Sequence, residues 1–282
     1  MENWINLRQE RDFGEKFNAT FTFARQNFKN LFMCILFLGT PLMIVYTLLI
    51  TYVVSGLRPE SFDFIPIITY FAVAILIAII AQVWLTAISY SYIAEYLDGN
   101  RMITPKAVFD RAIRNILPLI GGGIVSGLIT FIGLFMLIIP GIYLGIALSF
   151  VTSIIVFEQS SIGNAISRSM TLIIGKWWST LGLIFVMGLV VTLMSLVFSI
   201  PQSIINLGSQ LAGTTPNFTV GYVITSLINV IGNTLLYPLL YITIAFQYFN
   251  LVERNESTGL KSEIDNIAQQ QTIENKGNEG EY

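Results

Sequence analysis

The longest uncharged stretch of the chain decides its fold. Residues 177–252 read WWSTLGLIFVMGLVVTLMSLVFSIPQSIINLGSQLAGTTPNFTVGYVITSLINVIGNTLLYPLLYITIAFQYFNLV, which is 76 residues without Asp, Glu, Lys or Arg. A helix needs about 20 apolar residues to cross the hydrocarbon core of a bilayer, so this stretch holds two spans and a connection. The polar residues from Pro201 to Pro216 favour an interruption there. The stretch therefore predicts a hairpin of two membrane-spanning helices.

Three further stretches carry no charge: residues 30–57, 64–94 and 115–157, which are 28, 31 and 43 residues long. The third is twice the length of one span, and Pro and Gly in Ile139-Pro140-Gly141 favour a turn or break within it. The fold class predicted is an all-α polytopic membrane bundle of six transmembrane helices with three interfacial amphipathic helices. The expected spans are about 31–55, 66–94, 116–137, 140–157, 179–200 and 220–249, within a membrane domain of residues 1–253.

The composition agrees with this class. Hydrophobic residues make up 54% and charged residues 11% of the 282, and the mean hydropathy is +0.70, whereas a soluble domain carries about 25% charge. The chain has no histidine and one cysteine, Cys34. These counts exclude a disulfide framework, a zinc site of the Cys/His type and a histidine base. The net charge of −2 gives no case for nucleic-acid binding.

The basic residues predict the orientation. With the N-terminus inside, the inner segments 1–30, 95–114, 158–176 and 253–282 hold 14 of the 15 Lys and Arg residues, and only Arg58 lies outside. Cytoplasmic loops are enriched in these residues, so both termini are expected in the cytoplasm. Residues 1–30 mix acids and bases and precede a span-length run, which favours an uncleaved anchor.

The inner segments have the pattern of amphipathic helices at the membrane surface, about 12–30, 104–115 and 161–175. In the first, Lys16 and Arg25 lie off a stripe whose members recur every three or four positions. Each segment runs into a hairpin, and an internal repeat and the pattern that bilayer physics imposes explain this equally well. The stripe consists of Phe13, Phe17, Phe21, Ala24, Phe28 and Leu31.

Local signals mark where these helices begin and end. Asp12 followed by Glu15 resembles a capping box, and Thr104-Pro105 supplies an N-cap and a proline at the first helical position. Ser160 or Ser161 can cap the third helix, and Gly175 is a natural C-terminal stop.

Part of the chain resembles a known family. The stretches Ile138-Ile139-Pro140-Gly141-Ile142, Val156-Phe157-Glu158 and Asn164-Ala165-Ile166-Ser167-Arg168-Ser169 are similar to the membrane domain of bacterial glycerophosphodiester phosphodiesterases and of related Bacteroidetes-like inner-membrane proteins. The opening Arg11-Asp12-Phe13-Gly14-Glu15 shares this likeness. The resemblance covers about half the chain and implies a helical membrane fold of unknown activity. The catalytic domain of those enzymes is separate and soluble, and this chain has no room for it.

No Asp, Glu, Lys or Arg lies inside the expected spans, which argues against a proton-coupled pump, a voltage sensor and a charged ion pathway. At the inner end of the fourth span, Glu158 and Arg168 are expected to pair at the interface, with a headgroup or ligand contact as the alternative. The most polar intramembrane residues follow one face of the sixth span and a parallel line on the second. Interhelical hydrogen bonds explain them, and a cavity for a neutral solute is the alternative. They are Thr225, Asn229, Asn233, Tyr237 and Tyr241, with Gln82 and Thr86.

Small residues predict close helix packing. Gly123 and Gly127 form a GxxxG motif in the third span, and Gly141 and Gly145 repeat the spacing in the fourth. Such residues let two helix backbones approach closely. We therefore expect all four glycines at helix contacts.

These patterns favour a membrane protein without catalytic apparatus, a cofactor or a metal. We expect an accessory or scaffold protein that organises lipid or partners in the bacterial cytoplasmic (inner) membrane, with membrane lipids and other membrane proteins as partners and no nucleic acid. A permease for neutral or lipidic solutes is the alternative, and an enzyme would need acids clustered at one membrane face. Residues 254–282 are acidic and glutamine-rich, which predicts a disordered cytoplasmic tail.

Overall fold

The computed structural model describes residues 5–56, 64–100, 102–214 and 219–257, and every regular element within these ranges is helical. Most helices are long, and η1 is a π-helical segment in the first span. The elements are α1 (Phe13–Gln26), α2 (Phe28–Cys34), η1 (Ile35–Gly39), α3 (Thr40–Gly56), α4 (Phe64–Leu97), α5 (Pro105–Met136), α6 (Ile138–Ala147), α7 (Val151–Glu158), α8 (Ile162–Leu172), α9 (Trp177–Leu211) and α10 (Val220–Glu256).

Within these residues, six helical stretches are long and apolar enough to cross a membrane. The first joins α2, η1 and α3 end to end, and the fourth joins α6 and α7. The prediction of an all-α polytopic membrane bundle with six transmembrane helices is therefore confirmed. The stretches are Phe28–Thr51, Ile68–Leu97, Pro105–Met136, Ile138–Glu158, Trp177–Leu211 and Val220–Glu256.

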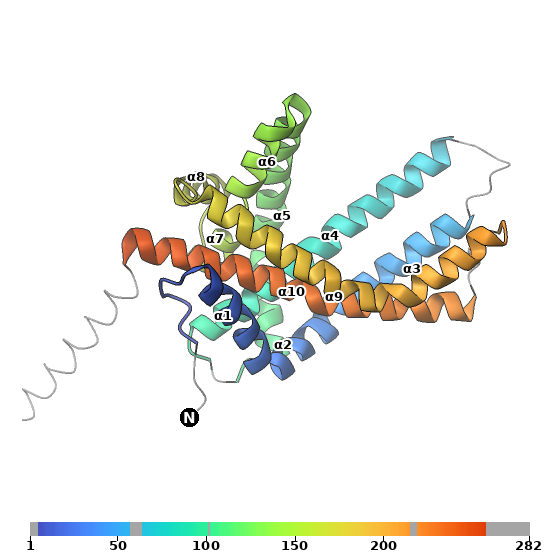
Figure 1. Cartoon of the computed structure of the whole chain (residues 1–282), viewed down its shortest axis with the longest axis horizontal. Helices are drawn as coiled ribbons and strands as arrows, with labels where there is room; N and C mark the ends of the chain where they lie inside the picture. The colour runs from blue at the N-terminus through green and yellow to red at the C-terminus, as the bar shows by residue number, and fades with distance from the viewer. Residues whose placement is uncertain (1–4, 57–63, 101, 215–218, 258–282) are drawn as a thin grey trace, which may run out of the picture.

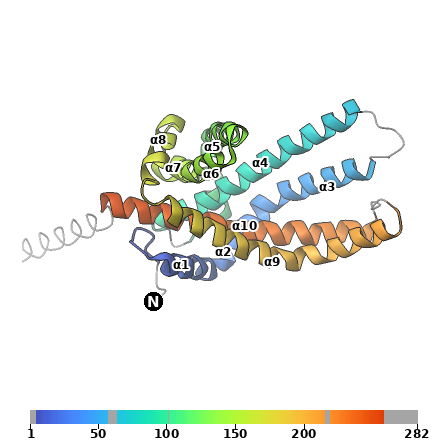
Figure 2. The same ribbon diagram turned by 45° about the horizontal axis from the view of Figure 1, so that its top comes forward.

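The six stretches form two groups that diverge. Helices α3, α4, α9 and α10 extend together in one direction, whereas the hairpin of α5 and α6 leaves the bundle at a steep angle (Figure 1). In a turned view the hairpin is seen nearly end-on, while α4 still extends alongside α3 (Figure 2). Helices α4 and α5 therefore contact each other over only part of their length and open a gap toward their far ends.

The third and fourth spans are separated by a single residue. Leu137 has an extended backbone, with φ −159° and ψ 144°, and Pro140 and Gly141 lie in the first turns of α6. The break predicted at Ile139-Pro140-Gly141 therefore lies a few residues earlier in the chain, at Leu137. A helix tolerates proline in its first turn, because the backbone N–H there has no helical partner anyway.

The interruption predicted from Pro201 onward begins later. Helix α9 continues through Pro201 to Leu211. A proline within a membrane helix is tolerated where neighbouring groups satisfy the freed backbone, and the polar residues that follow have partners in the bundle. The Oε1 atom of Gln202 accepts hydrogen bonds from Thr225 Oγ1 at 2.7 Å and Ser226 Oγ at 2.9 Å.

The predicted interfacial helices have mixed outcomes. The Asp12–Glu15 capping box is present, but α1 ends at Gln26 and Asn27 separates it from α2. The second segment begins at the predicted Thr104 cap and is no separate helix, because α5 runs from Pro105 to Met136 without a break. The three amphipathic helices are therefore not confirmed as a set. The third segment contains α8, and Gly175 follows it with φ +70°.

Helix α1 is buried on more than the predicted face. Phe17 and Phe21 of the aromatic stripe pack against Met187, Val191, Leu236 and Leu239 of α9 and α10, whereas Phe13 is 43% exposed. Lys16 lies off this stripe, as predicted, and is nevertheless buried together with Thr20 and Phe23. Exposed aromatic residues such as Phe13 can face lipid in a membrane protein.

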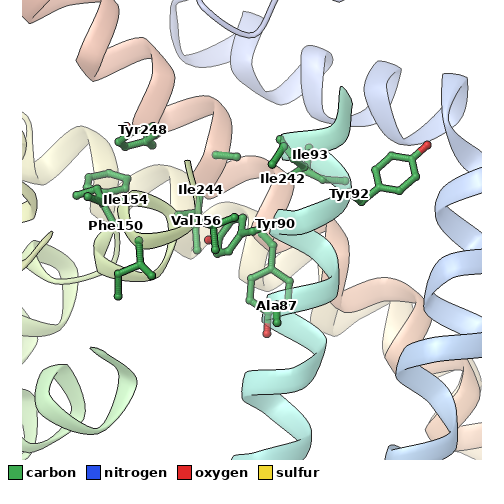
Figure 3. Packing of buried hydrophobic residues seen from close by; sticks show 14 of the residues in the cluster. Ala87, Tyr90, Tyr92, Ile93, Phe150, Ile154, Val156, Ile242, Ile244 and Tyr248 are labelled. Atoms are coloured by element: carbon green, nitrogen blue, oxygen red, sulfur yellow. The ribbon is translucent and has the colours of Figure 1, made fainter. Parts of the chain in front are cut away.

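The core lies where the inner halves of α4, α7 and α10 meet. Tyr90 of α4 packs edge-on against Phe157 of α7 and Tyr241 of α10, and Figure 3 shows Tyr90 among buried residues of all three helices. Both Tyr90 and Tyr92 are fully covered. This core fixes the ends of three spans relative to one another and positions the polar groups described next.

Candidate functional site

A charged pocket of about 530 Å³ lies at the end of the bundle where α4, α5, α7, α8 and α10 meet. Two arginines organise it. Arg111 of α5 forms an ion pair with Glu95 at 2.8 Å and contacts Asp98, both near the end of α4. The pocket is lined by Arg111, Arg168 and Glu256, which come from three different segments predicted to lie on the inner side.

The second arginine forms the predicted interfacial pair. Arg168 of α8 lies 2.5 Å from Oε1 of Glu158, and its Nη1 atom lies 2.8 Å from Oε1 of Glu256. Tyr248 of α10 also donates a hydrogen bond to Glu158. Burial lowers the pKa of Arg168, but the hydrogen bonds and charges of Glu256 and Glu158 outweigh it and leave the pKa above its usual value. These groups tie α7, α8 and α10 together.

Sequence reasoning missed Glu256. It assigned residues 254–282 to a disordered tail, whereas α10 continues through Glu256 and ends at Ser257 in a left-handed conformation. The remainder of that tail, residues 258–282, lies outside the described residues. The continuing amphipathic spacing of Tyr248, Val252 and Glu256 was the available signal, because residues four apart share one helix face.

The polar line on α10 makes hydrogen bonds within the bundle. Thr225 contacts Gln202 as described above, and Asn229 Nδ2 donates to Ser199 Oγ of α9 at 3.0 Å. Asn233 Nδ2 donates instead to the carbonyl oxygen of Asn229 in its own helix at 2.8 Å, and Tyr237 is 39% exposed. The part of the line nearer the N-terminus of α10, Thr225 and Asn229, therefore joins α9 to α10.

The end of the line nearer the C-terminus of α10, at Tyr241, meets the polar residues of α4. Gln82 Nε2 donates to the hydroxyl of Tyr241, and Thr86 Oγ1 donates to the carbonyl oxygen of Gln82 at 2.9 Å. The two predicted lines thus touch at one point. Of the other members of the α10 line, Thr225 and Asn229 bond to α9 and Asn233 bonds within α10, so the two lines do not run side by side.

A buried lysine was not singled out from the sequence. Lys16 of α1 is only 3% exposed, and its Nζ atom donates to Gln247 Oε1 at 2.8 Å. Gln247 of α10 is fully buried and donates in turn to Thr180 Oγ1 of α9 at 2.8 Å. Burial lowers the pKa of Lys16, while the charge of Asp12 raises it in part. This chain of bonds fastens α1 to the last hairpin.

The four glycines predicted at helix contacts divide into two pairs. A Cβ atom added at Gly141 would lie 2.5 Å from Leu134 Cα, and one at Gly145 would lie 3.3 Å from Thr130 Cγ2, so α6 packs closely on α5. At Gly123 and Gly127 an added Cβ atom meets no heavy atom within 4 Å. The packing prediction for these two is wrong, because the α5–α6 hairpin diverges from α4 at this level.

Gly123 and Gly127 instead line an open space, here called the lateral groove. It has a volume of about 850 Å³ and lies between α3 and α4 on one side and α5 on the other. Gln82 is the polar residue of α4 that lines it, and its amide donates a hydrogen bond to Tyr241. The remaining walls are formed largely by Tyr46, Ile50, Phe71, Ile75, Ile79, Ile120, Ile124 and Leu128.

Among the described residues, no group of three or more His, Cys, Asp and Glu side chains could hold a metal ion. The acids of the charged pocket are engaged with arginines. The arrangement can bind polar groups at the bundle end and apolar chains in the lateral groove.

Residues 107–251 match a family model described as a domain of unknown function, DUF7847. The match spans about half of the chain, from the first turn of α5 to the last turns of α10. It includes Arg111, Glu158, Arg168 and Gly127. Neither a curated protein nor a solved structure matches the chain.

Proposed function

This chain belongs to the DUF7847 family, and we propose that it is a non-enzymatic accessory or scaffold protein that holds phospholipid acyl chains in the lateral groove. The observation that carries the proposal is an apolar space of about 850 Å³ whose lining residues all belong to three of the membrane-spanning stretches. An apolar ligand fits such a space, because its walls offer few polar partners. Acyl chains are the apolar molecules that surround it.

The glycines support the same function. Glycine within a helix costs about 0.5–1 kcal/mol relative to alanine, so a helix interior normally avoids it. Gly123 and Gly127 have no close neighbour that would require a missing side chain. An acyl chain lying against α5 would make use of the space they leave.

The contacts of the polar line favour the scaffold over the permease. A hydrated path between the second and sixth spans would need polar groups that face one another across it. Asn229 and Thr225 bond to α9 instead, and Gln82 bonds to Tyr241. We further propose that the similarity to the membrane domain of glycerophosphodiester phosphodiesterases reflects a shared lipid-facing scaffold.

The lateral groove can be tested by filling it. Gly127→Leu introduces a side chain into the groove without a steric clash, and Gly188→Leu makes the same change on α9, where an added Cβ also meets nothing within 4 Å. The full chain, purified in a mild detergent, is analysed by native mass spectrometry for retained phosphatidylethanolamine. We expect Gly127→Leu to retain at least one lipid fewer than the parent, and Gly188→Leu to retain as many.

Thermal melting is the check that both variants are folded. Replacing glycine by leucine within a helix is favourable by itself, so neither melting temperature should fall. Equal lipid retention by the parent and Gly127→Leu would contradict the proposal, since the groove would then hold no lipid.

For location we propose the bacterial cytoplasmic membrane, with both termini in the cytoplasm. The charged pocket supports this, because it joins segments 95–114, 158–176 and 253–256 at one end of the bundle. Those segments hold most of the basic residues that follow the first span. A green fluorescent protein fused after Tyr282 should fluoresce, and alkaline phosphatase fused there should be inactive. An active phosphatase fusion would reverse the orientation.

A further inference from the structure

A second groove lies where α1 turns into α2, here called the elbow groove. It has a volume of about 440 Å³ and is bounded by α1, α2 and η1 on one side and by α9 and α10 on the other. Its walls are apolar and include Phe28, Phe32, Phe198, Leu235 and Leu239. Arg25 is the single charged side chain among the described residues that line it.

Among the residues that the structure describes, Arg25 has no partner of opposite charge. It is exposed at the end of α1, and in the described part of the chain it forms no ion pair. Residues 16–59 contain no Asp or Glu, so no acid near it in the sequence balances its charge or that of Lys29. The mouth of the elbow groove is therefore positive and its interior is apolar.

The position and the length of the groove match one half of a bilayer. Arg25 lies three residues before Phe28, where the first membrane-spanning stretch begins, so we expect its guanidinium at headgroup level. On α10 the lining positions run from Ile242 to Gly232, and ten helical residues cover about 15 Å. Half of a hydrocarbon core about 30 Å thick is the same length.

Phe198 blocks one end of the groove. At Gly232 an added Cβ atom would lie 2.1 Å from the ring of Phe198, so α9 and α10 are in direct contact there. The space thus ends against packed side chains near Gly232, and Arg25 lies among the residues that line it. A chain of limited length, with a polar group at one end, fits this shape.

We propose that the elbow groove binds one anionic phospholipid, with its phosphate at Arg25 and one acyl chain between α2 and α10. The lateral groove differs from this site, because it has no charged residue among its described lining residues and offers no reason to prefer one headgroup. Arginine recognises phosphate through two parallel hydrogen bonds, and a basic residue near an anionic headgroup contributes about 1 kcal/mol. That contribution corresponds to about a fivefold preference for an anionic over a zwitterionic lipid.

The test compares phosphatidylglycerol with phosphatidylcholine as probes, added to the full chain in a neutral detergent. The readouts are the rise in melting temperature and the lipid retained in native mass spectrometry. We expect phosphatidylglycerol to bind about fivefold more tightly to the parent. Arg25→Gln should remove this preference, and Arg25→Lys should keep it, because both lipids carry the phosphate and the preference arises from the net charge of the headgroup, which lysine also attracts.

Two matched controls separate the site from general effects. Lys106→Gln removes an exposed cation from the first turn of α5 and should keep the preference. Met194→Trp places a large ring in the groove and should weaken binding of both lipids, whereas Leu193→Trp changes its exposed neighbour outside the groove and should not. Gly127→Leu should also leave the preference unchanged, so failure of the lateral groove and failure of this proposal can be told apart.

Three results would overturn the proposal. One is an unchanged preference in Arg25→Gln, and another is an equal loss in Lys106→Gln, which would indicate only a diffuse basic surface. The third is unchanged binding in Met194→Trp while Arg25→Gln loses its preference. In that case the groove would be filled by something else, such as a second copy or the acidic residues after Ser257.

Discussion

Replacing Gln247 with leucine is expected to destabilise the protein by about 3 kcal/mol near neutral pH, because it leaves the ammonium group of Lys16 buried without an acceptor. Lys16 is 3% exposed, and Gln247 Oε1 lies 2.8 Å from its Nζ atom. The change also removes the bond from Gln247 to Thr180. Thermal melting in detergent should show a fall of roughly 6–12 °C.

A double variant tests the cause. Lys16→Met combined with Gln247→Leu removes both polar partners, and replacing a buried polar pair by apolar groups of similar shape is often nearly neutral. We therefore expect the double variant to recover most of the lost stability. If Gln247→Leu melts within 2 °C of the parent, then Lys16 reaches water and its burial has no energetic consequence.

The pH dependence follows from the same burial. The pKa of Lys16 is lowered from its usual value of 10.5, mainly by burial, and the charges of Lys176 and Arg254 lower it further while Asp12 raises it. Between the lowered pKa and 10.5 the unfolded chain binds more protons than the folded one, so stability rises with pH in that window. In Gln247→Leu the pKa should fall further and the window should widen toward lower pH. The double variant lacks the lysine and should show no such rise.

The six spans could be predicted because the sequence contains four charge-free runs, two of them long enough for one span and two long enough for a pair of spans. The helix starts at Asp12 and Thr104 were predicted because a cap acts over three residues and leaves a local signature. The Glu158–Arg168 pair was predicted because a short connection brings the two residues to the same interface. Each of these features depends on local sequence and on the bilayer.

The second buried face of α1 could not be predicted in the same way. Periodicity reveals one stripe, and the aromatic stripe was the stronger signal. Lys16 is buried because α10 covers its side of the helix as well, and its partner Gln247 lies 231 residues away in the chain. Polar residues at the inner ends of the last two spans, such as Thr180 and Gln247, were the available hint, because buried amides and hydroxyls need partners.

The glycine motifs show the limit most clearly. Gly123 with Gly127 and Gly141 with Gly145 have the same spacing of four residues. Only the second pair meets another helix, because the α5–α6 hairpin folds on itself and diverges from α4 (Figure 1). The direction of a hairpin depends on contacts with other helices, so spacing along one helix does not determine which face is packed.

Gly141 lies in close contact with α5, so Gly141→Ala is expected to destabilise the protein by about 2–3 kcal/mol. The added methyl group would lie 2.3 Å from Leu134 Cγ and 2.5 Å from Leu134 Cα. A backbone atom cannot move aside as a flexible side chain can, so α6 must shift away from α5. With only Leu137 joining the two helices, the hairpin has no slack near this contact.

Gly127→Ala is the matched control, because it makes the same change on α5 where nothing lies within 4 Å. It should leave the free energy of unfolding unchanged or raise it by the 0.5–1 kcal/mol that alanine gains over glycine in a helix, so the melting temperature should not fall. The two variants thus differ in the sign of their effect, and differential scanning fluorimetry in detergent can resolve this. Equal melting of both would mean that α5 and α6 do not approach as closely as the Gly141–Leu134 contact requires. In that case the lateral groove, whose α5 wall is held by the same hairpin, would lose its structural basis.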